Sequence, residues 1–192
     1  MRAARRAPAS PHGSACSGRR RCVRAASWPW SRGASRPPRT WRCRPAASAA
    51  ELAVHFAVRH AVFVEEQALF AGGDRDPSDD DRATVHVVGV GADEIGGVVR
   101  LYPLAEPGLW KGDRLAVLRP YRHGLLGAEL VRFAVTTAGA RGGERMVAMI
   151  QVPNVGFFTE LGWNEAGDVE PYHGVDHRPM DIDLRSFNGR GR

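Results

Sequence analysis

Three stretches of the chain have the pattern of helices. The first opens at Ser48-Ala-Ala-Glu51, which has the form of a capping box, and continues to about Glu66. The second runs from about Leu125 to Ala138 with a 3.6-residue apolar period. The third covers Asn154–Leu161 and is closed by Gly162. We therefore expect three helices, of which the third is short.

Apolar and β-branched runs around these helices predict the strands. Two of them, Thr84–Val90 and Ile95–Tyr102, are joined by Gly91–Glu94 as in an antiparallel hairpin. The other predicted strands are Thr40–Arg44, Leu115–Leu118, Arg145–Gln151, Trp163–Tyr172 and Arg178–Leu184. The order β-α-β-β-β-α-β-α-β-β predicts an α/β fold, in which a mixed sheet has helices on both faces.

Charge divides the chain into two unlike parts. Residues 1–50 contain twelve arginines and no lysine, aspartate or glutamate, so their formal charge is +12. Because the whole chain has a formal net charge of +6, the remainder carries −6. Residues 1–38 also lack apolar periodicity, and we expect a disordered, arginine-rich leader produced by a start codon assigned too early. A basic arm for nucleic acid or a membrane is the alternative. We expect one domain over residues 39–185 and a disordered tail over 186–192.

Composition excludes several classes of protein. No run approaches the roughly 20 apolar residues of a membrane span, so we expect a cytoplasmic protein with no membrane partner. The acidic balance of the remainder argues against a nucleic-acid partner for the domain. All three cysteines (Cys16, Cys22 and Cys43) lie within residues 1–50, so we expect no cysteine in the catalytic body and therefore neither a disulfide framework nor a cysteine nucleophile there.

The most distinctive segment leads from an apolar strand through a basic turn into the second helix. It reads Arg114-Leu-Ala-Val-Leu-Arg-Pro-Tyr-Arg-His-Gly-Leu-Leu-Gly-Ala128. Backbone N–H groups at such a turn, at the positive end of the helix dipole, suit a pyrophosphate. The spacing fits neither a Walker loop nor a dinucleotide-binding fingerprint. The turn Arg122-His-Gly-Leu125-Leu-Gly127 resembles the acyl-CoA-binding turn of the GNAT superfamily of N-acyltransferases, Arg/Gln-x-x-Gly-x-Gly/Ala, with Leu125 in place of the usual first glycine.

Two further motifs extend this resemblance to about residues 40–184. Gln151-x-x-Asn154-x-x-Phe-Phe158-x-x-Leu-Gly162-Trp is similar to a strand-to-helix element of the superfamily. Arg59-His-Ala-Val-Phe63-Val-Glu-Glu66-Gln67, an aspartate cluster and His173-Gly-x-x-His177-x-x-Met180 resemble the branch related to acyl-homoserine-lactone synthases. Within that branch the chain is similar to N-acyltransferase domains of bacterial nitrilase gene clusters. Many GNAT enzymes use a tyrosine on the late helix as the acid for the CoA thiolate, and here Phe157-Phe158 replaces it.

The resemblance implies an acyl-CoA site around the turn. It implies that the strand Leu115–Leu118 binds pantetheine and supplies an oxyanion-stabilising N–H, while the turn takes the pyrophosphate. Asn154 either contacts pantetheine or only caps its helix. The residues assigned to this site are Leu115, Ala116, Val117, Leu118, Arg122, His123, Gly124, Leu125, Leu126, Gly127, Ala128, Asn154 and Phe157.

Glu66, His173 and His177 are the candidates for acid–base catalysis. Glu65 and Glu66 end the first helix near the acceptor pocket that the resemblance implies, where one accepts the ammonium proton or both form a solvated helix end. His173 and His177 are four residues apart, but Gly174 and β-rich neighbours argue against a helical zinc pair, and we predict no metal. A histidine acting as base near neutral pH is the other interpretation.

Basic and acidic residues outside the turn are candidates for the acceptor side. Arg59, Arg100 and Asp74 or Asp76 match an Arg/Asp cluster that organises the acceptor in homoserine-lactone synthases, or else the arginines are buried ion-pair partners. The aspartates of residues 74–81 form either an acidic lip for a cationic acceptor or a solvated loop.

Together these features predict an N-acyltransferase. We expect an acyl group, most simply acetyl, to pass from acyl-CoA as co-substrate to the amine of a small molecule within a ternary complex. A homoserine-lactone-synthase-like reaction and a catalytically silent acyl-CoA-binding module are the alternatives. A homo-oligomer is compatible with the sequence.

Overall fold

The computed structural model describes residues 40–92 and 94–187, so the predicted leader over residues 1–38 and residues 188–192 of the predicted tail lie outside the described part. Eight strands form one sheet in the order β1-β2-β3-β4-β5-β8-β6, and β7 also pairs with β8. Their bounds are β1 Arg42–Pro45, β2 Val85–Gly91, β3 Glu94–Pro103, β4 Leu109–Val117, β5 Arg145–Gln151, β6 Asn164–Glu165, β7 Glu170–Tyr172 and β8 Val175–Asp183. Among the strands of the described residues, only β4 and β5 pair in parallel, so the sheet is mixed as predicted.

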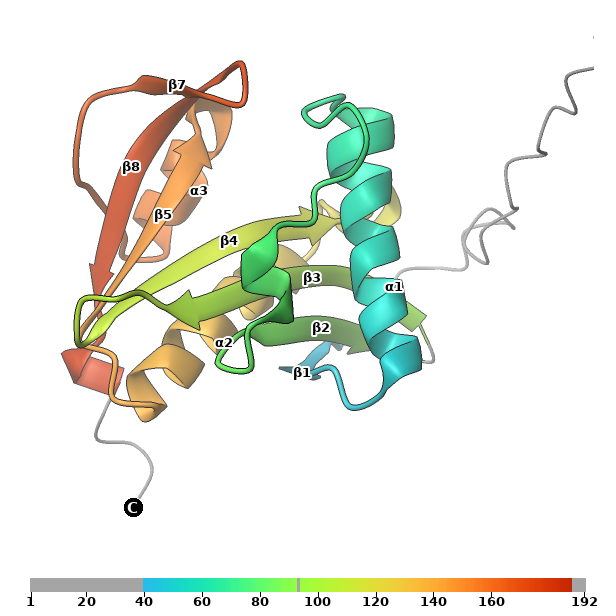
Figure 1. Ribbon diagram of the computed structural model, residues 1–192, viewed down its shortest axis with the longest axis horizontal. Coiled ribbons are helices and arrows are strands. Elements are labelled where there is room, and N and C mark those ends of the chain that lie inside the picture. The colour runs from blue at the N-terminus through green and yellow to red at the C-terminus, as the bar shows by residue number, and fades with distance from the viewer. Residues whose placement is uncertain (1–39, 93, 188–192) are drawn as a thin grey trace, which may run out of the picture. The chain divides into compact units, whose positions relative to one another are not determined.

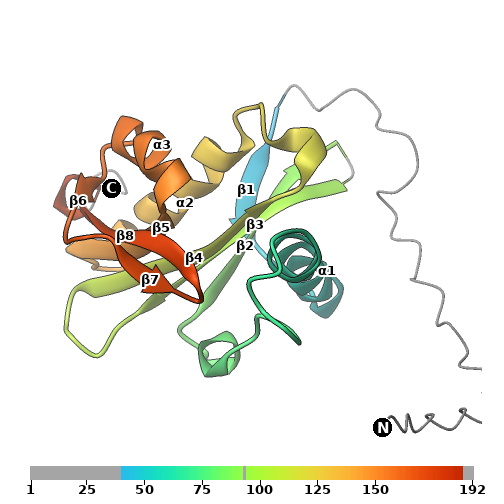
Figure 2. The same ribbon diagram turned by 90° about the horizontal axis from the view of Figure 1, so that it is seen from above.

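Helices cover both faces of the sheet, as Figures 1 and 2 show. Helix α1 (Ala49–Arg59) packs on β2, β3 and β4, while α2 (Leu126–Ala140) lies on the opposite face with the short α3 (Val155–Glu160). Helix α2 approaches β2 closely, because a Cβ at Gly89 would overlap the Leu126 side chain. The predicted mixed α/β fold is therefore confirmed.

The first helix begins as the sequence predicts and ends differently. Ser48 Oγ accepts a hydrogen bond from the Glu51 N–H at 3.2 Å, which is one half of the predicted capping box. The Glu51 carboxylate accepts from the N–H of Ala47 at 2.7 Å, not from that of Ser48, and is also held by Arg44. After Arg59 the helix widens into a π-helix over His60–Glu66, a form that is often found beside functional sites.

Two predicted strands are wrong in extent. The strand expected over Leu115–Leu118 is the end of the longer β4, which begins at Leu109. The first half of β4 was not predicted because Lys111, Asp113 and Arg114 interrupt its apolar pattern. The single strand expected over residues 163–172 is two short strands, β6 and β7, because an irregular segment over residues 166–169, with a bend at Gly167, separates them.

Cys43 lies in β1, so the folded domain contains a cysteine, contrary to the prediction. Burial, and secondarily the charge of Glu129, raises the pKa of its thiol to about 11. The group therefore stays protonated at neutral pH and is a poor nucleophile.

Candidate active site

The parallel strands β4 and β5 form a fork. Leu109–Lys111 of β4 pair with Arg145–Val147 of β5. The later residues of the two strands do not pair with each other. Figure 1 shows the strands diverging from their common end. Residues 112–115 of β4 and 148–151 of β5 instead line a cavity of about 150 Å³.

A β-bulge shapes the β4 arm of the fork. Arg114 and Leu115 together lie opposite Val99 of β3, and Arg114 has a left-handed backbone with φ of +53°. Such a conformation costs a non-glycine residue roughly 1–3 kcal/mol and persists where surrounding contacts fix it. Here the Arg114 guanidinium donates to the Asp74 carbonyl at 3.2 Å and to the Asp76 carboxylate at 3.1 Å.

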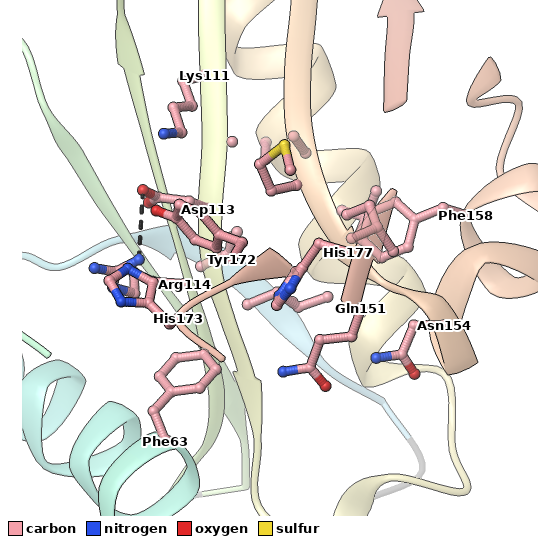
Figure 3. A pocket seen from close by; sticks show the side chains of 18 of the residues that line it. Phe63, Lys111, Asp113, Arg114, Gln151, Asn154, Phe158, Tyr172, His173 and His177 are labelled. Atoms are coloured by element: carbon pink, nitrogen blue, oxygen red, sulfur yellow. Dashed lines mark ion pairs between the residues drawn. The ribbon is translucent and has the colours of Figure 1, made fainter. Parts of the chain in front are cut away.

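The lining of the cavity has a polar part and an apolar part, which we call the polar limb and the apolar limb. The polar limb, on the α1 side, is lined by Lys111, Asp113, Arg114, Gln151, Tyr172, His173 and His177, with Phe63 and Phe70 beside them. The apolar limb, on the α2 side, is lined by Val131, Ala134, Met146, Ala148, Phe158 and Trp163. Figure 3 shows most of the polar side chains at one end of the cavity and Phe158 at the other, with His177 between them.

His177 is a nearly buried residue of the cavity wall. It lies on β8 opposite Gln151 of β5, and only 6% of its surface is exposed. Its Nδ1 lies 2.7 Å from the carbonyl oxygen of Val175, which accepts hydrogen bonds but cannot donate them. Nδ1 therefore carries the proton of the neutral ring, and Nε2 keeps its lone pair.

His173 joins two segments that are distant in sequence. It lies in the turn between β7 and β8 with φ of +50°, and its ring centroid is 4.5 Å from that of Phe70 and 4.4 Å from that of Tyr172. Gln67 accepts a hydrogen bond from Gln151 at 3.1 Å beside this contact. The segment after the π-helix and the β7–β8 turn thus meet across the polar limb.

Buried arginines and aspartates form a network behind the polar limb. Its members are Arg59, Asp74, Asp76, Asp79, Arg100, Asp113 and Arg114. Arg59 pairs with Asp74 and Asp79 at 2.6 Å each, and all three side chains are almost fully buried. Burial opposes the charge of Asp79, but hydrogen bonds from Arg59 outweigh it and lower the pKa of this carboxyl below its usual range.

The second buried arginine of the network reaches the cavity. Arg100 donates to Asp76 at 2.8 Å and to Asp113 at 2.7 Å, and Asp113 lines the polar limb. Burial alone would lower the pKa of Arg100, but these hydrogen bonds raise it. The interpretation as a solvated loop is therefore wrong for Asp74 and Asp79, whereas Asp80 and Asp81 are exposed.

The turn before α2 contacts the end of the π-helix. Arg122 donates from Nη1 and Nη2 to the two carboxylate oxygens of Glu66 at 2.6 and 2.7 Å, and Arg119 lies 3.3 Å from the same carboxylate. The hydrogen bond from Arg122 is the main reason that the pKa of Glu66 lies below its ordinary value. Glu66 does not line the cavity. Glu65 is exposed, and its Oε1 lies 3.8 Å from Nε2 of His60.

The start of α2 has no side-chain cap for its first backbone N–H groups. The first N–H groups of any helix have no acceptor within the helix, and α2 begins at Leu126. Leu125 is 68% exposed, and a Cβ at Gly127 would lie 3.5 Å from the Phe157 ring. Asn154 precedes α3 without capping it through its side chain, and it lines the cavity.

Comparison with protein families decides the class. The profile of the acetyltransferase (GNAT) family matches residues 50–163, which is more than half of the chain. The chain belongs to the GNAT family. GNAT proteins use acyl-CoA and act on amine acceptors, so the coarse class is that of an acyl-CoA-dependent N-acyltransferase. No curated protein sequence that was compared matches the chain.

Solved structures share the GNAT fold with this chain. A Lactobacillus plantarum protein described as a candidate N-acetyltransferase is 24% identical, with a TM-score of 0.68 over 76% of this chain and 99% of that one. Escherichia coli ElaA is 21% identical, with a TM-score of 0.66 over 74% and 97%. The CoA-dependent acyl-homoserine lactone synthase BjaI is 21% identical, with a TM-score of 0.61 over 73% and 80%. The suspected synthase branch is thus among the structural neighbours.

The structure brings together most of the sequence-based candidates and adds others. His173 and His177 share the polar limb, and Arg59, Asp74, Asp76 and Arg100 share the network. Sequence analysis missed the cavity residues Lys111, Asp113 and Tyr172, although polar residues inside a strand were a signal for the first two. Within residues 40–92 and 94–187 no helix is long and apolar enough to cross a bilayer, and no group of three or more potential metal ligands occurs.

Proposed function

We propose that this GNAT protein transfers an acyl group from acyl-CoA to the amine of a small molecule at the fork between β4 and β5. One observation carries the proposal: the strands separate after Lys111 and Val147, and the cavity between them has the acceptor nitrogen of His177 in its wall. Such an arrangement gives a thioester access to both strands and to a base.

The acyl-CoA binds from the α2 side. The N–H groups at the start of α2 take the pyrophosphate, and the segment 115–118, which contains the end of β4 and Leu118 after it, binds the pantetheine arm. Asn154 contacts the same arm, because its side chain lines the cavity and does not cap α3. The thioester carbonyl then lies at the bulge of β4.

Transfer proceeds by direct attack. The acceptor enters the polar limb as an ammonium ion, and Nε2 of His177 removes one proton. The neutral amine adds to the thioester carbonyl, and a backbone N–H of segment 115–118 stabilises the oxyanion. The C–S bond breaks, the nitrogen of the adduct loses its second proton to solvent as the amide forms, and the CoA thiolate takes a proton from solvent, since Phe157 and Phe158 have no proton to give.

His177 is a better base than Glu66 on geometric grounds. Glu66 is bound by Arg122 and Arg119 outside the cavity, and its lowered pKa weakens it as a proton acceptor. We assign His173 to the wall of the acceptor pocket, because its ring contacts Phe70 and Tyr172. Arg59 and Arg100 position Asp113 and Arg114 through the network, and these two side chains face the acceptor.

A second candidate reaction is acyl-homoserine lactone formation. The Arg–Asp network beside the polar limb favours it, as does the structural similarity to BjaI, whose structure was solved with SAM and isopentyl-CoA. In this case the acceptor carries a sulfonium group, and its amine attacks the same thioester.

Turnover distinguishes these candidates. The full-length protein is incubated with acyl-CoA and a panel of primary amines that includes S-adenosylmethionine, and released CoA thiol and products are measured by mass spectrometry. We expect an N-acyl product, and a lactone product would establish the second candidate. Binding of acyl-CoA without release of CoA across the panel would mean a silent binding module and would contradict the proposed transfer.

A further inference from the structure

The transfer steps proposed above do not use Lys111, which is the single lysine of the chain. It lies on β4 and lines the polar limb. Figure 3 shows it above Asp113 and Arg114, on the same side of the cavity. Within residues 40–92 and 94–187 its side chain donates no hydrogen bond and has no carboxylate within ion-pair distance. The polar limb therefore contains a cation without a partner in the protein.

The neighbouring cations, in contrast, are occupied. Arg114 is the other lysine or arginine among the residues that line the cavity, and it donates to the Asp76 carboxylate at 3.1 Å. Two nitrogens of Arg100 hold the two carboxylate oxygens of Asp113 at 2.7 Å each. Removing an unpaired charge from water is unfavourable, so a cation held in a cavity favours an anionic ligand. Of these groups, Lys111 is the one that is free to bind it.

Charges of both signs line this part of the cavity. The network behind the polar limb has three arginines and four aspartates, which leaves one negative charge in excess when every group is ionised. This excess favours the ammonium ion of the acceptor, whereas Lys111 favours an anion. A small molecule with an ammonium group and a carboxylate matches both charges.

The position of Lys111 along the fork fits such a molecule. Lys111 pairs with Val147 of β5, whereas His177 lies opposite Gln151, four residues further along β5. At about 3.3 Å per residue the two levels are about 13 Å apart, and the two side chains bridge part of this separation. Figure 3 shows Lys111 and Asn154 at opposite ends of the cavity. Since the proposed CoA arm comes from the Asn154 end, an acceptor that presents its amine to His177 extends toward Lys111.

We infer that Lys111 binds a carboxylate of the acceptor, so that the acceptor is a small molecule with both a primary amine and a carboxylate. The inference rests on the proposed function and names the chemical class of its acceptor. A lysine and a carboxylate form a charge-assisted hydrogen bond, which is stronger than a neutral one. A bond of this kind changes affinity by about ten- to a hundredfold.

Paired acceptors test the inference in the full-length protein with acyl-CoA. Glycine, β-alanine, γ-aminobutyrate and L-phenylalanine are each compared with the amino alcohol in which CH₂OH replaces the carboxylate. The amines of such a pair are similarly basic, so the comparison isolates the carboxylate. Release of CoA thiol gives kcat/KM for each compound. In the pairs that react we expect kcat/KM to be at least about tenfold higher for the amino acid, mainly through a lower KM.

Variants of Lys111 connect this preference to the lysine. In Lys111→Met and Lys111→Gln the ratio of kcat/KM within a pair falls to within about twofold of one, because the cation is lost. Lys111→Arg keeps a cation and restores a preference of at least about fivefold. Arg145→Met is the matched control, since it removes an exposed cation of β5 that pairs opposite Leu109 and lies outside this cavity. It keeps the ratio of the wild type.

Two results would overturn the inference and leave the proposed transfer intact. One is equal kcat/KM within every pair for the wild type, which would show that no carboxylate is recognised. The other is a preference for amino acids that survives in both neutral variants of Lys111, which would show that another group binds the carboxylate. If no amine releases CoA, the proposed function itself fails, and the inference fails with it.

Discussion

The guanidinium of Arg122 binds both carboxylate oxygens of Glu66, with N–O distances of 2.6 and 2.7 Å. Arg122 belongs to the turn proposed to take the CoA pyrophosphate, whereas Glu66 ends the π-helix that leads to the polar limb. The Glu66 carboxylate therefore occupies the Arg122 guanidinium, which is the cation that a CoA phosphate would approach.

Removing this carboxylate tests whether Glu66 is the catalytic base or only the ion-pair partner of Arg122. Glu66→Gln frees Arg122, so we expect acyl-CoA to bind about two- to fivefold tighter, a modest gain because the pair is partly exposed. The catalytic rate at saturating substrates stays within about threefold of wild type, since the base lies elsewhere. Titration and steady-state kinetics measure the two effects. A large loss of kcat with unchanged affinity would identify Glu66 as the base.

The proposed base makes a different prediction. His177→Gln removes the nitrogen that accepts the ammonium proton, so kcat falls by about 10²- to 10⁴-fold while acyl-CoA affinity is unchanged. Release of CoA thiol measures the rate. His60→Gln is the control, because His60 is half exposed and outside the cavity. Equal activity of the two variants would remove His177 from the mechanism.

Two histidines in contact, the buried His55 of α1 and the largely buried His86 of β2, predict acid sensitivity. Burial, together with the nearby charges of His86 and Arg59, lowers the pKa of His55 to about 3, and burial also lowers the pKa of His86. Below about pH 6.5 these histidines bind protons in the unfolded chain but stay neutral in the folded chain. The free energy of unfolding is therefore at its full value above this pH and falls as the pH drops.

Urea unfolding at pH 7, 6 and 5 measures this loss. We expect the free energy of unfolding to fall by up to about 1.4 kcal/mol per pH unit for each histidine. His55→Gln removes one titrating group and makes the slope shallower. The window above pH 5 separates the histidines from Asp76 and Asp79, whose pKa values the neighbouring arginines hold below the ordinary range of aspartate. A slope unchanged by His55→Gln would contradict the assignment.

The Arg–Asp network predicts a large cost for removing one partner. Arg100→Met leaves the carboxylates of Asp76 and Asp113 without their main cation, so unfolding becomes easier by about 3–5 kcal/mol. Arg75→Met is the control, since Arg75 and Asp80 form an exposed pair, and its effect stays within about 0.5 kcal/mol. Similar melting curves for the two variants would show that the network contributes little to stability.

Sequence predicted those elements whose pattern is local. Residues 145–151 were predicted as a buried strand with the bounds of β5, because the run is almost wholly apolar. The hairpin of β2 and β3 followed from the turn residues around Gly91 and Ala92. Local propensity and tertiary structure agree at these positions.

The elements that sequence missed depend on distant partners. The first half of β4 contains Lys111 and Asp113, which face the polar limb and break the expected apolar pattern. Likewise, an aspartate-rich segment is expected to be exposed to solvent unless the arginines that pair with it can be identified from the sequence. Burial of Asp74 and Asp79 depends on Arg59, which is at least 15 residues away in sequence. Such departures from local rules concentrate at the candidate site.

The most direct test of the acyl-CoA site is a calorimetric titration of the full-length protein with acyl-CoA, compared with Gly127→Glu. The glutamate places a negative charge in the first turn of α2, where the pyrophosphate is proposed to bind. We predict micromolar binding by the wild type and its loss in the variant, with an unchanged melting temperature. Equal binding by both proteins, or no binding by the wild type, would contradict the proposed site at the fork of β4 and β5.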